Sequence, residues 1–144
     1  MLHLKSFSVV TLGILLIAGT SSAQSIFGGT YEGVIHSSGK DFAGLTELEM
    51  TEHGGITGSY VFQGRSKYET GTLTNCNLES FILMCHWTDA YGAGDWRVKF
   101  SPDYVRFRGQ WYGNIGQIEE FGDKGGLRWD GVRKQPASSP NYGS

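Results

Sequence analysis

The fold is decided by the stretch from Gly94 to Tyr112, which reads G-D-W-R-V-K-F-S-P-D-Y-V-R-F-R-G-Q-W-Y. Apolar and polar residues alternate on both sides of the segment 101–104, S-P-D-Y. Successive strand residues point to opposite faces, so each half carries an apolar row and a charged row. Serine and then proline at the first two positions favour a type I turn at 101–104. The stretch therefore predicts an antiparallel hairpin with one buried face and one solvated face.

The same alternation recurs along the chain between glycine-rich turns, such as Gly54-Gly55, and no segment after the first 23 residues keeps apolar residues at helical spacing. Connections are expected at 37–41, 64–67, 89–94 and 113–126. Eight short strands at hairpin spacing predict an all-β, eight-stranded antiparallel meander barrel, because closure between the last strand and the first leaves no exposed edge. The expected strands cover about 29–36, 45–53, 56–63, 68–76, 81–88, 94–100, 105–111 and 127–134.

The first 23 residues are expected to be a secretory signal peptide. Lys5 precedes an apolar run from Val9 to Ala18, and small residues stand at 21–23. The alternative is a membrane anchor, but the run is much shorter than the roughly 20 residues needed to cross a bilayer. Cleavage after Ala23 would leave a barrel domain at 24–134 and a tail at 135–144 that we expect to be disordered. The protein would then be periplasmic or extracellular.

The two cysteines, Cys76 and Cys85, are expected to form a disulfide, because export leads to an oxidising compartment. The alternative, a metal pair, lacks the usual C-x-x-C spacing. Direct pairing across a hairpin would put both cysteines on one face. That register would turn Leu73 and Met84 outward, and a β-bulge would change it. The residues that would then share the inward face are Thr70, Thr72, Thr74, Leu83 and Trp87.

The interior of the expected barrel is rich in aromatic side chains. An eight-stranded barrel is either filled by its side chains or holds one small ligand. A glycine followed two residues later by an aromatic recurs, as at Gly58-Tyr60 and Gly109-Trp111, and this spacing suits either aromatic packing over bent strands or a stack of rings on a ligand. The expected inward row is Tyr31, Met50, Tyr60, Phe62, Trp87, Trp96, Phe100, Phe107, Trp111 and Trp129. The candidate ligand-binding residues are Tyr31, Tyr60, Thr72, Thr74, Trp87, Trp96 and Trp111, with a partly polar, hollow wall near Thr72, Thr74 and Trp87.

Three short elements resemble the avidin and streptavidin barrels, which are eight-stranded exported meanders. The segment 29–31, G-T-Y, is similar to their opening G-T-W, the segment 56–60, I-T-G-S-Y, to their third-strand L-T-G-T-Y, and 109–111, G-Q-W, to their T-Q-W. The resemblance implies a shared architecture. Of the residues that contact biotin in that family, only Tyr60 and the Trp111 region have counterparts, since Glu32 and Gly33 follow Tyr31 and the closing G-x-D is replaced by W-D-G at 129–131.

Composition and motifs reduce the number of functional classes that the sequence supports. The formal net charge is −2 and the arginines are scattered, which does not favour a nucleic-acid partner. His36, His53 and His86 lack local ligand spacing, so no metal or other cofactor is expected, and no motif designates catalytic residues.

Three functional hypotheses remain. The first is a non-enzymatic binding module for a small apolar or amphipathic ligand, or for a protein partner. The second is a small hydrolase or isomerase that uses His36, His86 or a carboxylate at the barrel mouth. The third is a structural or interaction protein with a filled barrel, whose charged exterior at Lys99, Arg106 and Arg108 would form the contact surface, for example in a homo-oligomer.

Overall fold

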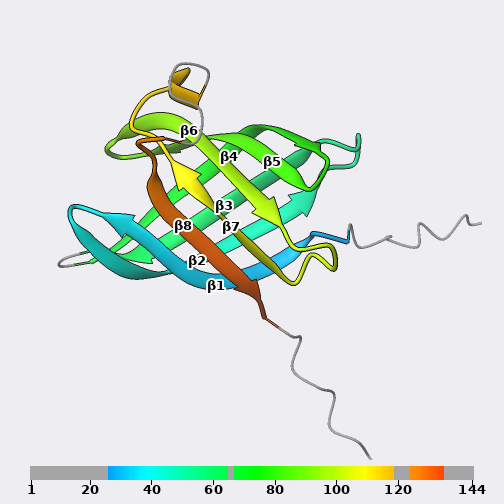
Figure 1. Ribbon diagram of the computed structural model, residues 1–144, viewed down its shortest axis with the longest axis horizontal. Helices are drawn as coiled ribbons and strands as arrows, with labels where there is room; N and C mark the ends of the chain where they lie inside the picture. The colour runs from blue at the N-terminus through cyan, green and yellow to red at the C-terminus, as the bar shows by residue number, and fades with distance from the viewer. Residues whose placement is uncertain (1–25, 65–66, 119–123, 135–144) are drawn as a thin grey trace, which may run out of the picture.

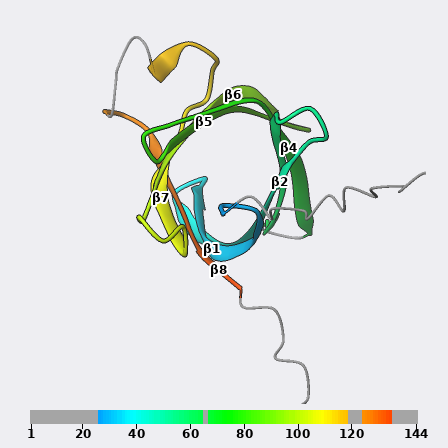
Figure 2. The ribbon, with the colours of Figure 1, turned by 90° about the vertical axis from the view of Figure 1, so that its right-hand side faces the viewer.

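The computed structural model describes residues 26–64, 67–118 and 124–134 (Figure 1). Eight strands follow one another along this part of the chain. They are β1 (Gly29–Ser37), β2 (Lys40–Met50), β3 (Ile56–Gln63), β4 (Tyr68–Glu79), β5 (Ile82–Asp89), β6 (Gly92–Phe100), β7 (Arg106–Trp111) and β8 (Leu127–Arg133). Each strand pairs antiparallel with its neighbours, and β8 pairs with β1. The predicted closed, eight-stranded meander barrel is therefore confirmed, and Figure 2 shows the strands as a ring.

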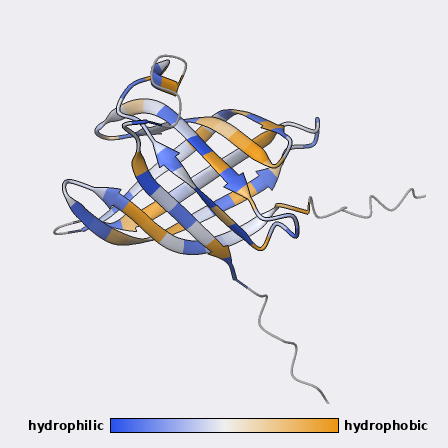
Figure 3. Ribbon diagram, in the orientation of Figure 1, coloured by the Kyte–Doolittle hydropathy of each residue, from blue (hydrophilic) through white to orange (hydrophobic). Residues whose placement is uncertain are grey.

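Alternation decides which side chains face the interior. In β6, Trp96, Val98 and Phe100 are buried, whereas Lys99 is exposed on the outer surface. Hydrophobic and hydrophilic residues alternate in this way along much of the sheet (Figure 3). The two-residue period read from the sequence therefore does place an apolar lining inside the ring.

The hairpin between β6 and β7 closes as the sequence predicts. The backbone N–H of Tyr104 donates to the carbonyl of Ser101 at 2.8 Å, and the Ser101 N–H donates to the carbonyl of Arg106 at 2.9 Å. The Ser101 hydroxyl donates to the Asp103 carboxylate at 2.6 Å, and this bond, with one from the Val105 N–H, lowers the pKa of Asp103. Tyr104 has a positive φ of 56°, which adds one left-handed residue after the turn.

Two connections are shorter than predicted. The expected loops at 37–41 and 89–94 are instead tight turns, centred on Ser38-Gly39 and Ala90-Tyr91, because the flanking strands continue into them. Ser38 and Gly39 both have positive φ values, 51° and 75°, which two-residue hairpin turns require. The segments 1–25 and 135–144, where the signal peptide and the tail are expected, lie outside the described residues. Within the described residues, no helix is long and apolar enough to cross a membrane.

The disulfide between Cys76 and Cys85 forms, but the register derived from it is wrong. Thr74 pairs with His86 and Asn77 with Met84, so two residues of β4 stand opposite Cys85 alone. This β-bulge shifts the alternation by one residue, and Asn75 takes a positive φ of 51° within it. Leu73 is consequently buried inside the barrel, whereas Thr70, Thr72 and Thr74 are exposed outside it. Leu83 and Trp87 point inward and Met84 outward, as predicted.

One end of the barrel is closed. Phe27 is buried there and its ring lies 6.5 Å from that of Phe100 and 6.4 Å from that of Tyr104. The Tyr31 hydroxyl donates to the Phe27 carbonyl at 2.7 Å, and Arg133 donates to Tyr31 at 2.9 Å. Burial at this end raises the pKa of Tyr31, although Arg133 opposes the shift. At the same end the prediction that Met50 lies in the interior is wrong, because Met50 is 48% exposed beyond the last buried residue of β2.

The aromatic interior fits because rings lie over glycines of the neighbouring strand. Tyr60 pairs with Gly71, and a methyl group at Gly71 would overlap the Tyr60 ring. Trp87 pairs with Gly94 in the same way, and a Cβ there would lie 2.6 Å from the indole nitrogen. The recurrent glycines of the sequence therefore make room for large side chains on the adjacent strand.

Candidate functional site

A cavity of about 230 Å³ opens at the end of the barrel opposite Phe27. This end, which we call the barrel mouth, carries the turns after β1 and β5, and strand ends from β1, β3, β5, β7 and β8 supply most of the wall. The lining residues are Ile35, Ser37, Ser38, Tyr60, Phe62, Trp87, Asp89, Tyr91, Trp111 and Trp129. Deeper in the barrel the interior is filled, with Tyr31, Trp96 and Phe107 among its fully buried side chains.

Aromatic rings meet at steep angles around the cavity. The Trp87 and Trp111 rings are 5.4 Å apart between centroids and stand at 88° to each other. Tyr60 and Trp129 are 4.7 Å apart at 80°. At these separations the rings of each pair are in edge-to-face contact, the arrangement that aromatic quadrupoles favour. The aromatic lining therefore forms a shaped wall, with ring planes fixed by their neighbours.

Hydrogen bonds hold the three lining indoles in place. Trp87 donates from Nε1 to the carbonyl of Tyr112 at 2.8 Å, and Trp111 donates to the carbonyl of His36 at 2.8 Å. Trp129 donates to the Thr46 hydroxyl at 3.0 Å. Because each indole N–H already has an acceptor, these tryptophans offer a ligand their carbon surfaces rather than a hydrogen-bond donor. Recognition by these three residues is accordingly apolar or through the π-face.

Asp89 is the charged residue of the lining. Its carboxylate accepts a hydrogen bond from the Tyr60 hydroxyl at 2.7 Å and another from the Tyr91 backbone N–H at 2.8 Å. The Tyr91 hydroxyl in turn donates to Glu69 at 2.7 Å. Burial, and then the hydrogen bond to Asp89, raise the pKa of Tyr60 far above its usual value. Tyr60 therefore stays protonated and acts as the donor in this hydrogen bond.

The candidate ligand-binding residues fall into three groups. Tyr60, Trp87 and Trp111 come together around the cavity. Tyr31 and Trp96 point inward but have no exposed surface and lie in the filled part of the barrel. Thr72 and Thr74 are on the outer surface because of the bulge in β4, so the proposed polar wall does not exist.

Sequence reasoning missed the polar residues of the mouth. Asp89 and Tyr91 fall in the segment 89–94, which was interpreted as a loop. Ser37 and Ser38 fall in another expected loop, 37–41. A signal was present for Asp89, which follows Trp87 by two residues and so shares its face of β5. Trp129 was assigned to the interior but not to the ligand-binding set, and it lines the cavity as well.

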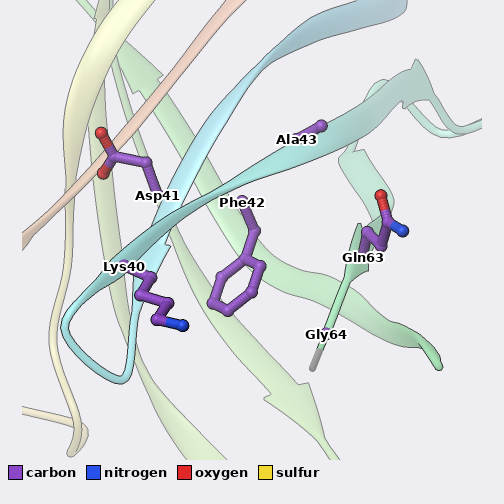
Figure 4. Close-up of a pocket in the computed structure, with 6 residues that line it drawn as sticks. All are labelled: Lys40, Asp41, Phe42, Ala43, Gln63 and Gly64. Carbon is purple, nitrogen blue, oxygen red and sulfur yellow. The ribbon is translucent and has the colours of Figure 1, made fainter. Parts of the chain in front are cut away.

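A second hollow lies at the rim, where β2 begins and β3 ends. It measures about 510 Å³ and is a shallow groove lined by Lys40, Asp41, Phe42, Ala43, Gln63 and Gly64. Figure 4 shows Lys40 and Phe42 on one side of β2 and Asp41 pointing away from them. The groove therefore wraps around a strand and does not enclose a space. Its lining ends at Gly64, the last described residue of this part of the chain, and we assign the groove no role.

His36 and His86 do not form a shared site. His36 contacts Asp41 at 2.7 Å on the surface, and His86 contacts Asn75 at 3.2 Å, with its other ring nitrogen 3.7 Å from Asp95. Neither ring lines the cavity. Among the described residues, no three histidine, cysteine or acidic side chains converge as metal ligands. The contacts of these rings therefore provide no catalytic arrangement at the mouth.

Asp95 has a structural role on the outside of β6. Its carboxylate accepts hydrogen bonds from the backbone N–H groups of Gly116 and Ile118 at 2.8 Å and 3.2 Å. Tyr112 also donates its backbone N–H to the Asp95 carbonyl at 2.9 Å. These contacts fix the start of the connection after β7 against the barrel, beside the carbonyl that holds Trp87.

Comparison with known proteins adds no family to this description. The sequence matches no protein-family model, and neither a curated protein nor a solved structure matches the chain.

Proposed function

We propose that the protein is an exported, non-enzymatic binding module that takes a small apolar or amphipathic ligand into the barrel mouth. The observation that carries the proposal is the cavity of about 230 Å³ with walls of Tyr60, Phe62, Trp87, Trp111 and Trp129. Pockets that bind small molecules are concave, largely apolar and equipped with a few polar groups, and this one has those properties. Export rests on the sequence of the first 23 residues alone.

The size of the cavity limits the ligand. Pockets for drug-sized molecules usually measure about 300–1,000 Å³, and this cavity is smaller at about 230 Å³. The ligand is therefore a molecule of about one or two rings, or a larger one that inserts a ring-sized group and leaves its remainder in solvent. The fully buried Trp96 and Phe107 block deeper entry.

The resemblance to avidins supports the location of the site. The two positions with counterparts in the biotin-contact set, Tyr60 and Trp111, both line the cavity. The closed eight-stranded barrel is compatible with that architecture. Glu32 departs from the family pattern and is exposed on the outer surface. We therefore propose a shared way of placing a ligand at the mouth, without carrying over biotin as the ligand.

Intrinsic tryptophan fluorescence tests the proposal directly, because three of the four tryptophans line the cavity. Screening the purified protein against small aromatic and amphipathic molecules should give saturable quenching or a spectral shift. Trp111→Phe, which alters the half-buried wall, should weaken binding. The matched substitution Tyr68→Phe changes an exposed aromatic outside the cavity and should leave binding unchanged. An absence of saturable binding across the screen would refute the small-molecule function, and a mature protein that does not begin near Gln24 would refute export by cleavage after Ala23.

A further inference from the structure

The charged side chain that lines the cavity at the barrel mouth is acidic. Asp89 lines the cavity and Glu69 stands behind Tyr91, within hydrogen-bond distance of its hydroxyl. No lysine or arginine is among the described residues that line the cavity. Lys40 lies at the rim but lines the outer groove (Figure 4). A ligand that enters the cavity therefore meets a negative charge beside aromatic walls.

The hydrogen bonds of Asp89 leave it able to bind a cation. The Tyr60 hydroxyl and the Tyr91 backbone N–H, which donate to its carboxylate, are neutral groups. These donors orient the two carboxylate oxygens but do not neutralise the negative charge of Asp89. Among the described residues, no lysine or arginine forms an ion pair with Asp89 that would neutralise it. An ionised carboxylate can accept about four hydrogen bonds, so two acceptor positions remain. A ligand ammonium group could occupy them with its N–H donors.

The neighbouring rings complete a cation site. Trp87 lies two residues before Asp89 on the same face of β5, and Trp111 stands at 88° to it, with centroids 5.4 Å apart. Because their N–H groups are bonded elsewhere, the indoles present π-surfaces, whose negative face attracts ammonium groups. Aromatic faces attract amines and quaternary ammonium groups, and the Asp89 carboxylate adds an acceptor for a charged hydrogen bond.

We infer that the ligand of the barrel mouth is a small organic cation, with a protonated amine or quaternary ammonium group held at Asp89 and an apolar body against Trp87, Trp111 and Tyr60. This inference rests on the proposed binding function and names its ligand class. The negative charge of the mouth selects cations over neutral molecules of the same shape and disfavours carboxylates.

A matched set of three probes tests the inference on the unaltered protein. Phenylethylamine, 2-phenylethanol and phenylacetate carry the same ring with a positive, a neutral and a negative group. We expect the amine to bind at least about tenfold more tightly than the alcohol, because a hydrogen bond between charged groups typically contributes that factor or more. The acid should bind more weakly than the alcohol. Titration calorimetry or tryptophan fluorescence gives the three dissociation constants.

The outcomes separate the two proposals. If the alcohol binds as tightly as the amine, or the acid binds best, the cation inference is wrong while the binding function stands. If none of the three binds and the wider screen is also negative, both fail. Asp89→Asn should raise the dissociation constant of the amine about 10- to 100-fold and leave that of the alcohol within about threefold. Glu49→Gln makes the same charge change on the exposed outer face and should alter neither value.

Discussion

The buried hydrogen bond between Thr46 and Trp129 allows the packing of the mouth to be tested through stability. Both residues are 2% exposed, and the indole Nε1 lies 3.0 Å from the Thr46 Oγ1 across 83 positions of sequence. Thr46→Val replaces the hydroxyl with a methyl group of similar size, so it opens no cavity. It leaves the indole N–H of Trp129 without an acceptor among aromatic neighbours, where water does not reach it.

A buried donor without a partner costs about 1–3 kcal/mol. Thr46→Val should therefore lower the free energy of unfolding by that amount, and the melting temperature by about 4 °C for each kcal/mol in a domain of this size. Urea denaturation with an unchanged slope would attribute the loss to the native state. Thr72→Val makes the same chemical change on the outer face of β4 and should cost less than about 0.5 kcal/mol.

Two results would refute this reasoning. A Thr46→Val protein within about 0.5 kcal/mol of the wild type would mean that the hydrogen bond contributes nothing net. A Thr72→Val protein that loses as much as Thr46→Val would mean that Thr72 is not in solvent, and the register of β4 would have to be reassigned.

Three further predictions concern the same barrel. Reducing the Cys76–Cys85 disulfide, which joins positions nine apart, should lower the free energy of unfolding by about 2–3 kcal/mol, as measured by urea denaturation with and without reductant. Gly71→Ala should cost about 1–3 kcal/mol and also weaken ligand binding, because the methyl group displaces Tyr60 from its place at the mouth. Above about pH 10 stability should fall by up to about 1.4 kcal/mol per pH unit on account of Tyr60, because the unfolded phenol releases its proton there while the native one retains it.

Each of these has a control and a contrary result. Equal stability of the oxidised and reduced protein would contradict the role of the disulfide. Gly113→Ala adds a methyl group whose nearest neighbour, the Gln117 side-chain oxygen, is 4.0 Å away, and it should leave stability unchanged or slightly raised. A comparable loss there would remove the argument from the Tyr60 ring. Tyr60→Phe should make the alkaline fall in stability shallower, and an identical fall would mean that Tyr60 titrates as it does in the unfolded chain.

The sequence was sufficient for the fold because one rule, alternation, applies along the strands with one interruption, at the bulge in β4. Trp96, Val98 and Phe100 read as inward and are inward. Closure between the first and last strands followed from the cost of exposed edges, and β8 does pair with β1. Short turns were less visible, since a two-residue turn such as Ser38-Gly39 depends on positive φ values that serine rarely signals.

The site was harder to predict because one extra residue changes the face of a whole segment. The bulge at Asn75 and Cys76 moved Thr72 and Thr74 from the interior to the surface. Asparagine tolerates positive φ better than most residues, so Asn75 beside a half-cystine was a usable signal for the bulge. The alternation of the sequence does not show how deep along the barrel axis an inward side chain lies. For this reason Trp96, in the filled part, was grouped with Trp87 and Trp111 at the mouth.

The most direct test of the binding site uses the indole N–H resonances of the four tryptophans in a two-dimensional nitrogen–proton NMR spectrum. Each gives a separate signal, and phenylethylamine can be titrated into the labelled protein while all four are followed. The barrel-mouth site predicts saturable shifts for Trp87 and Trp111, a smaller one for Trp129, and the smallest for Trp96, which is fully buried away from the cavity. Shifts confined to Trp96, or to backbone amides of the outer surface, would contradict a ligand site at the barrel mouth.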